Sequence, residues 1–196
     1  MNPASILAAI PGISVLVVGD ICLDRWCRYD PSEADISRET AIPRIAVVST
    51  EVTPGAGGTV ANNLVALGAK RVAVVGAIGD DGFGFELQHA LRARGIAGGQ
   101  LVIVPGMQTF TYTKLINDAT KQEDRPRVDF ITMRPLTKTA ETQILDRLQT
   151  GIAAHDLILI SDQAETSRGG NITEAVRDLL AALAPAYPDK WILVDS

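Results

Sequence analysis

Four short runs of apolar, mostly β-branched residues are the feature that most constrains the fold of this chain. The first, SVLVV, is followed directly by Gly19 and Asp20, as expected of a strand buried on both faces of a parallel sheet. The segments between the runs carry apolar residues at the i, i+4, i+7 spacing of a helix. This alternation predicts a layered α/β fold with a mainly parallel sheet. The expected strands are 14–18, 71–75, 157–160 and 191–194, and the expected helices are 60–68, 81–95, 137–151 and 172–183.

Two long segments, 25–52 and 107–134, interrupt the alternation. Within the second, TFTYTKLI alternates threonine with aromatic residues, which is typical of a strand with one exposed face. Extended patterns also begin at Arg44 and Val128. We expect these segments to form a small, mostly antiparallel sheet that stands off the main sheet and acts as a lid. The expected division is an α/β core from 1–24, 53–106 and 135–196, and a β-lid from 25–52 and 107–134.

Composition and charge exclude several classes of protein. The net charge is −5 and no run of lysine or arginine occurs, so nothing indicates a nucleic-acid or anionic-membrane partner. Cys22 and Cys27 are too few for a disulfide scaffold, and His89 and His155 do not complete the spacing of a structural zinc site, so no metal site is expected. The first residues have neither a positively charged start nor a long apolar run. We therefore expect no secretory signal or membrane span, and a cytoplasmic location.

The glycine-rich stretch TPGAGGTVANN is the first candidate ligand site. Gly55, Gly57 and Gly58 precede a predicted helix, where glycines let backbone N–H groups approach an oxygen-rich ligand. Two other interpretations stay open, namely tight packing of a strand-to-helix turn and a plain loop with Thr59 as helix N-cap. No Walker motif, G-x-S-x-G motif or G-x-G-x-x-G continuation of the first strand occurs. A P-loop NTPase, an α/β-hydrolase and a dinucleotide-binding Rossmann enzyme are therefore disfavoured.

Polar side chains near the ends of the predicted strands are further candidates. Asp20 and Asp24 follow the first strand, and the carboxyl ends of parallel strands face the ligand crevice, so either can accept hydrogen bonds from sugar hydroxyls. The alternatives are turn capping and surface solvation. Asp162, after LILIS, and Asn63, one helical turn after Thr59, have the same alternatives.

These motifs together resemble the ribokinase-like (PfkB) carbohydrate kinase family over about residues 14–196. The resemblance is carried by GDICLD (19–24), by PGAGG (54–58) followed by VANN (60–63), and by VGAIGDDGFG (75–84). Within the family, the chain resembles the heptose 7-phosphate kinase group through SRETAIP (37–43) and TYTK (111–114).

The resemblance implies a ribokinase-like three-layer α/β/α fold and transfer of the γ-phosphoryl group of ATP, with Mg²⁺, to a sugar hydroxyl. It implies a small-molecule sugar or sugar phosphate as substrate and a lid through which two copies form a homodimer. Lys114, Arg125 and Arg127 are candidates for binding a sugar phosphate, although a solvated hairpin face is the alternative for both arginines. The family usually has asparagine at the position of Thr59, which leaves the identity of the sugar open. The expected substrate-binding residues are Asp24, Gly55, Gly57, Gly58, Thr59, Asn63, Lys114 and Asp162.

One motif of the family is missing from the sequence. The anion hole and catalytic base of the family come from a C-terminal Asp-Thr-x-Gly-Ala-Gly-Asp-like motif, and the only Gly-Ala-Gly of this chain is at 55–57. We therefore expect no catalytic residue in these 196 residues and expect them to be inactive alone. The sequence also ends two residues after the expected buried-type strand 191–194, in the segment WILVDS, so we expect the C-terminal part of the fold to be missing. The alternatives are a non-catalytic sugar- or nucleoside-binding module and a nucleotide-binding domain of another family.

Overall fold

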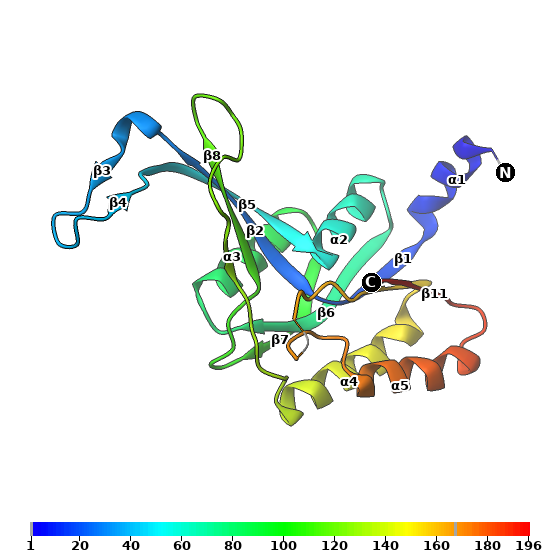
Figure 1. Ribbon diagram of the computed structural model, residues 1–196. Helices are drawn as coiled ribbons and strands as arrows, with labels where there is room; N and C mark the ends of the chain where they lie inside the picture. Colours follow the sequence, from blue (N-terminus) through cyan, green and yellow to red (C-terminus); the bar gives the residue numbers. More distant parts are fainter. Residues whose placement is uncertain (1, 167) are drawn as a thin grey trace.

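A five-stranded sheet lies at the centre of the computed structural model, which describes residues 2–166 and 168–196. Its strand order is β11-β10-β1-β6-β7, and every neighbouring pair is parallel (Figure 1). The predicted parallel sheet is confirmed. The strands are β1 (Ser14–Gly19), β6 (Arg71–Gly79), β7 (Ala97–Val104), β10 (Leu157–Ser161) and β11 (Trp191–Asp195).

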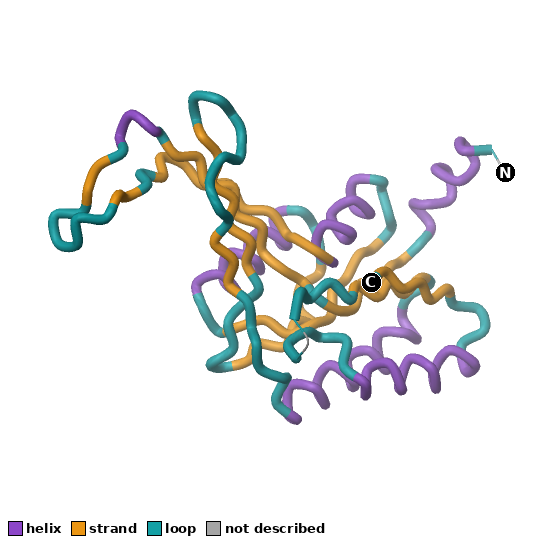
Figure 2. Tube along the Cα trace, viewed as in Figure 1, coloured by secondary structure: helices purple, strands orange, loops and turns teal. Residues whose placement is uncertain are grey.

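Helices cover both faces of this sheet, as Figure 2 shows. Val15 and Val17 of β1 face a core cluster shared with the helices α2 and α3, whereas Leu16 and Val18 face a cluster shared with α4 and α5. Burial on both faces explains why β1 is a continuous apolar run. The helices are α1 (Pro3–Ala9), α2 (Gly57–Ala66), α3 (Gly82–Ala93), α4 (Lys138–Ala154) and α5 (Glu174–Leu183), with short 3₁₀ segments at Ile10–Gly12, Pro31–Glu33 and Ala184–Ala186.

A second sheet rises from the first at the upper left of Figure 1, and we call it the standing sheet. Its order is β5-β2-β8-β9. Strand β2 pairs antiparallel with β5 and parallel with β8, and β8 pairs antiparallel with β9. The predicted second sheet is confirmed, although its central pairing is parallel. Its strands are β2 (Ile21–Tyr29), β5 (Val47–Ala56), β8 (Thr111–Asn117) and β9 (Val128–Phe130), and a small hairpin of β3 (Asp35–Ile36) and β4 (Pro43–Arg44) lies at its far end.

The structure also shows which side of β8 is buried. Thr111, Thr113 and Leu115 are buried, while Tyr112 and Lys114 are half-buried. The predicted alternation of buried and exposed residues is confirmed. The threonines point toward the packed side, so Tyr112 and Lys114 lie on the open face of the standing sheet.

Candidate functional site

The two sheets meet where β1 gives way to β2. Asp20 is the only residue between these strands, and its backbone N–H donates to the carbonyl of Ser161 at the end of β10 (2.9 Å). Strand β5 returns beside β2 and continues directly into α2 at Gly57. This junction therefore brings the carboxyl ends of β1 and β10 next to the base of the standing sheet and the first turn of α2.

Asp24 lies on β2 at the base of the standing sheet, opposite Tyr112 of β8. A Cβ atom at Gly55 would stand 2.7 Å from Oδ1 of Asp24, so the glycine leaves the space that this carboxylate occupies. Burial raises the pKa of the half-buried Asp24, while the positive charges of Lys114 and Arg127 act in the opposite direction. No hydrogen bond from the described residues contributes to this shift. Asp24 is therefore a partly desolvated acceptor available to a ligand.

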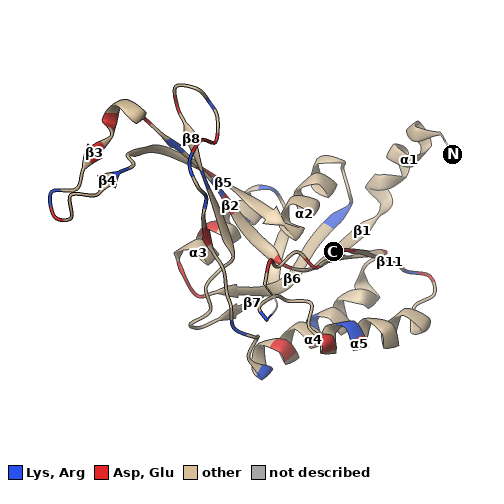
Figure 3. Cartoon of the chain, in the orientation of Figure 1, with Lys and Arg blue, Asp and Glu red and all other residues tan. Residues whose placement is uncertain are grey.

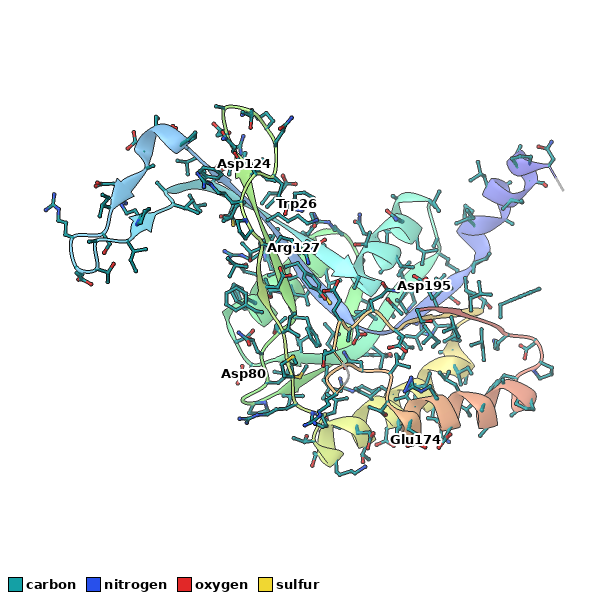
Figure 4. All side chains as sticks on the ribbon, in the orientation of Figure 1. Trp26, Asp80, Asp124, Arg127, Glu174 and Asp195 are labelled. Carbon is teal, nitrogen blue, oxygen red and sulfur yellow. The ribbon has the colours of Figure 1, made fainter. Side chains whose placement is uncertain are left out.

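Two cations are held against aromatic rings on the same face as Asp24. The Nζ atom of Lys114 lies 3.9 Å from the centre of the Trp26 ring. The guanidinium carbon of Arg127 lies 5.5 Å from the centre of the Tyr112 ring. Arg127 also forms an ion pair with Asp129 (2.8 Å). Figure 4 shows Trp26 and Arg127 on the standing sheet, and Figure 3 shows charges of both signs along it. The aromatic rings thus hold positive charge close to Asp24.

Gly57 and Gly58, the first two residues of α2, pack closely on β2 and β5. The N–H of Gly57 donates to the carbonyl of Asp20 (2.9 Å), and a Cβ atom at Gly57 would lie 2.9 Å from Cδ1 of Ile21. At Gly58, a Cβ atom would lie 2.6 Å from that of Pro54. Close packing, one of the interpretations left open by the sequence, is therefore part of the role of both glycines.

The first turn of α2 also presents hydrogen-bond donors. The helix begins at Gly57, so the N–H groups of Gly58 and Thr59 have no acceptor within it. The alternative of Thr59 as N-cap is wrong, because Ala56 holds that position with a φ of 50° and the Thr59 hydroxyl donates to the carbonyl of Pro54 (3.1 Å). A non-glycine residue in this backbone region is strained, and such strain often occurs at ligand sites.

Three further candidate residues are exposed or have a partner of their own in the structure. Asn63 is exposed on α2, one turn after Thr59. The carboxylate of Asp162 pairs with Arg177 of α5 (3.4 Å), and Arg125 donates to the hydroxyl of Tyr29 (3.3 Å). Their roles in binding a substrate stay predictions.

The second glycine-rich stretch, GDDGFG, binds the segment that leads into β8 of the standing sheet. Asp81 caps α3 by accepting from the N–H of Gly84 (2.7 Å), and it accepts from the N–H and the hydroxyl of Thr109 (2.9 and 2.8 Å). A Cβ atom at Gly84 would overlap the carbonyl of Gly79, and one at Gly79 would overlap that of Met107. This stretch therefore serves packing of the chain that leads into β8.

Two cavities among the described residues lie outside the surroundings of Asp24. The larger, of about 570 Å³, lies between segments 104–108 and 131–137. The smaller, of about 270 Å³, lies beside α2, β10 and β11 and includes Val60, Ser161 and Asp195. No cluster of three or more potential metal-ligating side chains occurs in the described part of the chain. None of its helices has the length and apolar character of a membrane span.

Comparisons with known proteins identify the relatives of this chain. No protein-family model matches it. It is 32% identical over 191 residues to bifunctional protein HldE of Rhodopseudomonas palustris strain BisB18, covering 97% of this chain and 37% of that protein. It is 34% identical over 152 residues to bifunctional protein HldE of Trichlorobacter lovleyi, covering 76% and 29%. The chain thus spans about a third of the length of these curated relatives.

The fold is shared with solved sugar kinases. A possible 1-phosphofructokinase from Thermotoga maritima matches with a TM-score of 0.66 at 22% identity, covering 92% of this chain and 53% of that one. A putative sugar kinase from Clostridium perfringens matches with a TM-score of 0.63 at 12% identity, covering 94% of this chain and 51% of that one. A ribokinase from Cryptococcus neoformans in complex with ADP matches with a TM-score of 0.53 at 20% identity, covering 93% and 49%. The chain is thus similar in sequence to part of the HldE proteins and shares its fold with ribokinase-like sugar kinases. The predicted resemblance and the ribokinase-like fold class are confirmed.

The hypothesis that Asp20 binds sugar hydroxyls is wrong. Its carboxylate is fully buried and accepts four hydrogen bonds. Two come from the N–H groups of Gln163 and Ala164 (2.9 Å each), and two from the N–H and the side-chain amide of Asn171 (2.9 and 3.0 Å). These fill its acceptor positions. The donors lie more than 140 residues along the chain, so no local pattern reveals them.

Proposed function

We propose that these residues form the sugar-binding half and the lid of an ATP-dependent kinase that phosphorylates a hydroxyl of a sugar or sugar phosphate. The observation that carries the proposal is the half-buried carboxylate of Asp24, which has a raised pKa and lies at the junction of the two sheets. The sugar-kinase-like character of the relatives supports it.

Each predicted residue has a role in this proposal. Asp24 accepts hydrogen bonds from two neighbouring sugar hydroxyls, because an ionised carboxylate only accepts. The free N–H groups of Gly58 and Thr59 donate to sugar oxygens, and Gly55 and Gly57 leave room for the carboxylate and the turn. Three further side chains bind at the rim of the site, the hydroxyl of Thr59, the amide of Asn63 and the carboxylate of Asp162. The ammonium of Lys114 interacts with a phosphate or other anionic group on the sugar.

ATP and Mg²⁺ are the expected cosubstrate and metal, and the described residues do not fit them. They contain no cluster of potential metal ligands, and the sequence has no Gly-Ala-Gly-Asp-like anion hole. Phosphoryl transfer depends on such positioning and electrostatic stabilisation. We therefore assign these residues to binding and orienting the sugar, and propose that alone they do not transfer phosphate. The same observation favours a second candidate for the isolated chain, a non-catalytic sugar- or nucleoside-binding module.

The proposal includes the assembly and location of the protein. Exposed apolar side chains occur on the far part of the standing sheet, which suits a contact between the lids of two copies. Homodimerisation through the lid and a cytoplasmic location belong to the proposed function. The side chains concerned are Ile36, Ile42, Ile45, Val47 and Val48.

Calorimetric titration of the chain with D-ribose, D-mannose, a D-manno-heptose 7-phosphate and adenosine tests the proposal. We expect one sugar or sugar phosphate to bind, and we expect Asp24→Asn to lose this binding. Asp178→Asn, at an exposed position on α5, is the control and should bind normally. An assay of ATP consumption with each sugar runs in parallel. Sugar binding without ATP consumption supports the proposed division of roles, and ATP consumption contradicts the proposed inactivity. Binding of adenosine alone favours the nucleoside-binding module, and no binding at all contradicts both candidates.

A further inference from the structure

Asp20 joins four parts of the fold. Its backbone N–H donates to Ser161 of β10, and its carbonyl accepts from Gly57 in the first turn of α2. Its carboxylate accepts the four hydrogen bonds from residues 163, 164 and 171. One of these donors, Asn171, is itself buried, and its side-chain oxygen accepts from the N–H of Ala77 in β6 (2.7 Å). The charge of Asp20 therefore fixes the chain after β10 to the β1–β2 junction, and Asn171 connects it further to β6.

The segment held in this way consists of residues 163–166 and 168–171, and we call it the anchored segment. Its second part packs against the connection that leaves the standing sheet. A Cβ atom at Gly169 would overlap the carbonyl of Thr132, and the hydroxyl of Thr132 donates to the carbonyl of Gln108 (2.6 Å). The anchored segment is thus fixed at Asp20 on one side and lies against the base of the standing sheet on the other.

Glu165 is the acidic side chain of the anchored segment, and it is exposed. Burial contributes most to raising the pKa of Tyr112, and the charges of Cys22 and Glu165 add to it. Tyr112 lies directly opposite Asp24 across the β2–β8 pair. Glu165 also directly follows Ala164, whose N–H donates to Asp20, and the carbonyl of Asp20 accepts from Gly57 in the first turn of α2. The backbone of Glu165 is therefore held next to the start of α2, where the sugar site is proposed.

We propose that Asp20 is a positioning residue that holds the anchored segment beside the sugar site, and that Glu165 is the side chain of this segment that contacts the bound sugar. This inference rests on the proposed function. Asp20 has no free acceptor for a ligand, whereas the exposed carboxylate of Glu165 accepts no hydrogen bond from the residues that the structure describes. Asp24 and Glu165 would then accept from different hydroxyls of the same sugar.

Amide hydrogen exchange measured by NMR tests the positioning role without any ligand. In Asp20→Asn, an NH₂ group replaces one acceptor oxygen, so at least two of the four donors lose their partner. We expect exchange of the N–H groups of Gln163 and Ala164, or of Asn171, to become at least about tenfold faster, equivalent to about 1.4 kcal/mol of local opening. The matched control is Asp81→Asn, another carboxylate that accepts from backbone N–H groups. It should affect Gly84 and Thr109 instead.

Sugar affinity tests the contact role. For whichever sugar of the panel binds, we expect Glu165→Gln to weaken the affinity about tenfold while amide exchange of the anchored segment stays unchanged. Asp178→Asn, also an exposed acid, is the control and should bind as the unchanged chain does. Asp20→Asn should weaken affinity together with its faster exchange. A purely structural role of Asp20 would not predict the effect of Glu165→Gln.

A further variant covers the case in which Asp20→Asn does not fold. Gly169→Ala leaves the Asp20 carboxylate intact and forces the second part of the anchored segment away from Thr132, so it should also weaken sugar affinity. Unchanged amide exchange in a folded Asp20→Asn overturns the positioning role. Unchanged affinity in Glu165→Gln overturns the contact role. If the unchanged chain binds no sugar, the proposed function and the contact role both fail, and the exchange measurement still decides whether Asp20 anchors the segment.

Discussion

The carboxylate of Asp24 stands where a side chain at residue 55 would have to go, because a Cβ atom on Gly55 would lie 2.7 Å from its Oδ1 atom. The two residues belong to neighbouring antiparallel strands, β2 and β5. A small residue at position 55 is thus a condition for an acidic residue at position 24. Gly55 of the glycine-rich stretch and Asp24 of the acidic strand end therefore depend on each other for space.

Gly55→Ala should abolish sugar binding with only a moderate loss of stability. The added methyl group displaces the Asp24 side chain, which is half-buried and can move outward, so we expect a loss of about 1–3 kcal/mol in the free energy of unfolding. Denaturant unfolding and calorimetric titration measure the two effects. Gly82→Ala is the matched control, because a Cβ atom there meets nothing within 4 Å. Normal sugar binding by Gly55→Ala would contradict the assignment of Asp24.

Sugar affinity should depend on pH through Asp24. Because burial raises its pKa, the carboxylate becomes protonated at a higher pH than the ordinary value of about 3.9 and then ceases to accept two hydrogen bonds. Affinity should therefore fall as pH decreases through a midpoint above about 3.9. Lys114→Met removes a positive charge that lowers this pKa, so it should move the midpoint upward. Titrations at several pH values measure the midpoint, and a midpoint that moves downward in Lys114→Met would contradict the prediction.

The same shift predicts a gain of stability when Asp24 is replaced. A carboxyl group whose pKa is higher in the folded than in the unfolded state lowers the free energy of unfolding as pH rises from the unfolded pKa to the folded one. That cost is fully present at neutral pH. Asp24→Asn should therefore be more stable than the unchanged chain at pH 7 while losing sugar binding. Thermal unfolding at pH 7 tests this, with Asp178→Asn as control, and a lower melting temperature for Asp24→Asn would contradict it.

Much of this fold could be predicted because its central strands are local patterns. The run from Val15 to Val18 indicates burial on both faces without knowledge of its neighbours, and the β8 alternation around Tyr112 indicates an open face. Strand β7 was not predicted, since its sequence begins AGGQ, and two glycines ahead of an apolar run are not typical of a strand, although its LVIV run is as long as LILI. The partners of Asp20 also could not be predicted, because residues 163, 164 and 171 reach it only through the parallel pairing of β1 and β10.

The second glycine-rich stretch should respond to substitution through stability. A methyl group at Gly84 overlaps the carbonyl of Gly79, so Gly84→Ala should lower the free energy of unfolding by about 1–3 kcal/mol. This loss is expected even though alanine has a higher helix propensity than glycine. The folded fraction of the variant should bind sugar with unchanged affinity. Gly82→Ala, two residues earlier in the same helix, should be neutral. Loss of sugar binding in a stable Gly84→Ala would indicate that this stretch contacts the ligand.

The far end of the standing sheet should control association of the chain with itself. Ile42 is 64% exposed in a region with several other exposed apolar side chains, and a single buried charge in an apolar contact is costly. We expect the unchanged chain to sediment as a dimer at micromolar concentration and Ile42→Asp to sediment as a monomer with the same thermal stability. Phe85→Asp is the matched control, since Phe85 is 68% exposed but lies on α3, and it should remain dimeric. A monomeric unchanged chain would contradict the dimer. A dimer that persists in Ile42→Asp but dissociates in Phe85→Asp would place the contact on α3 instead of the lid.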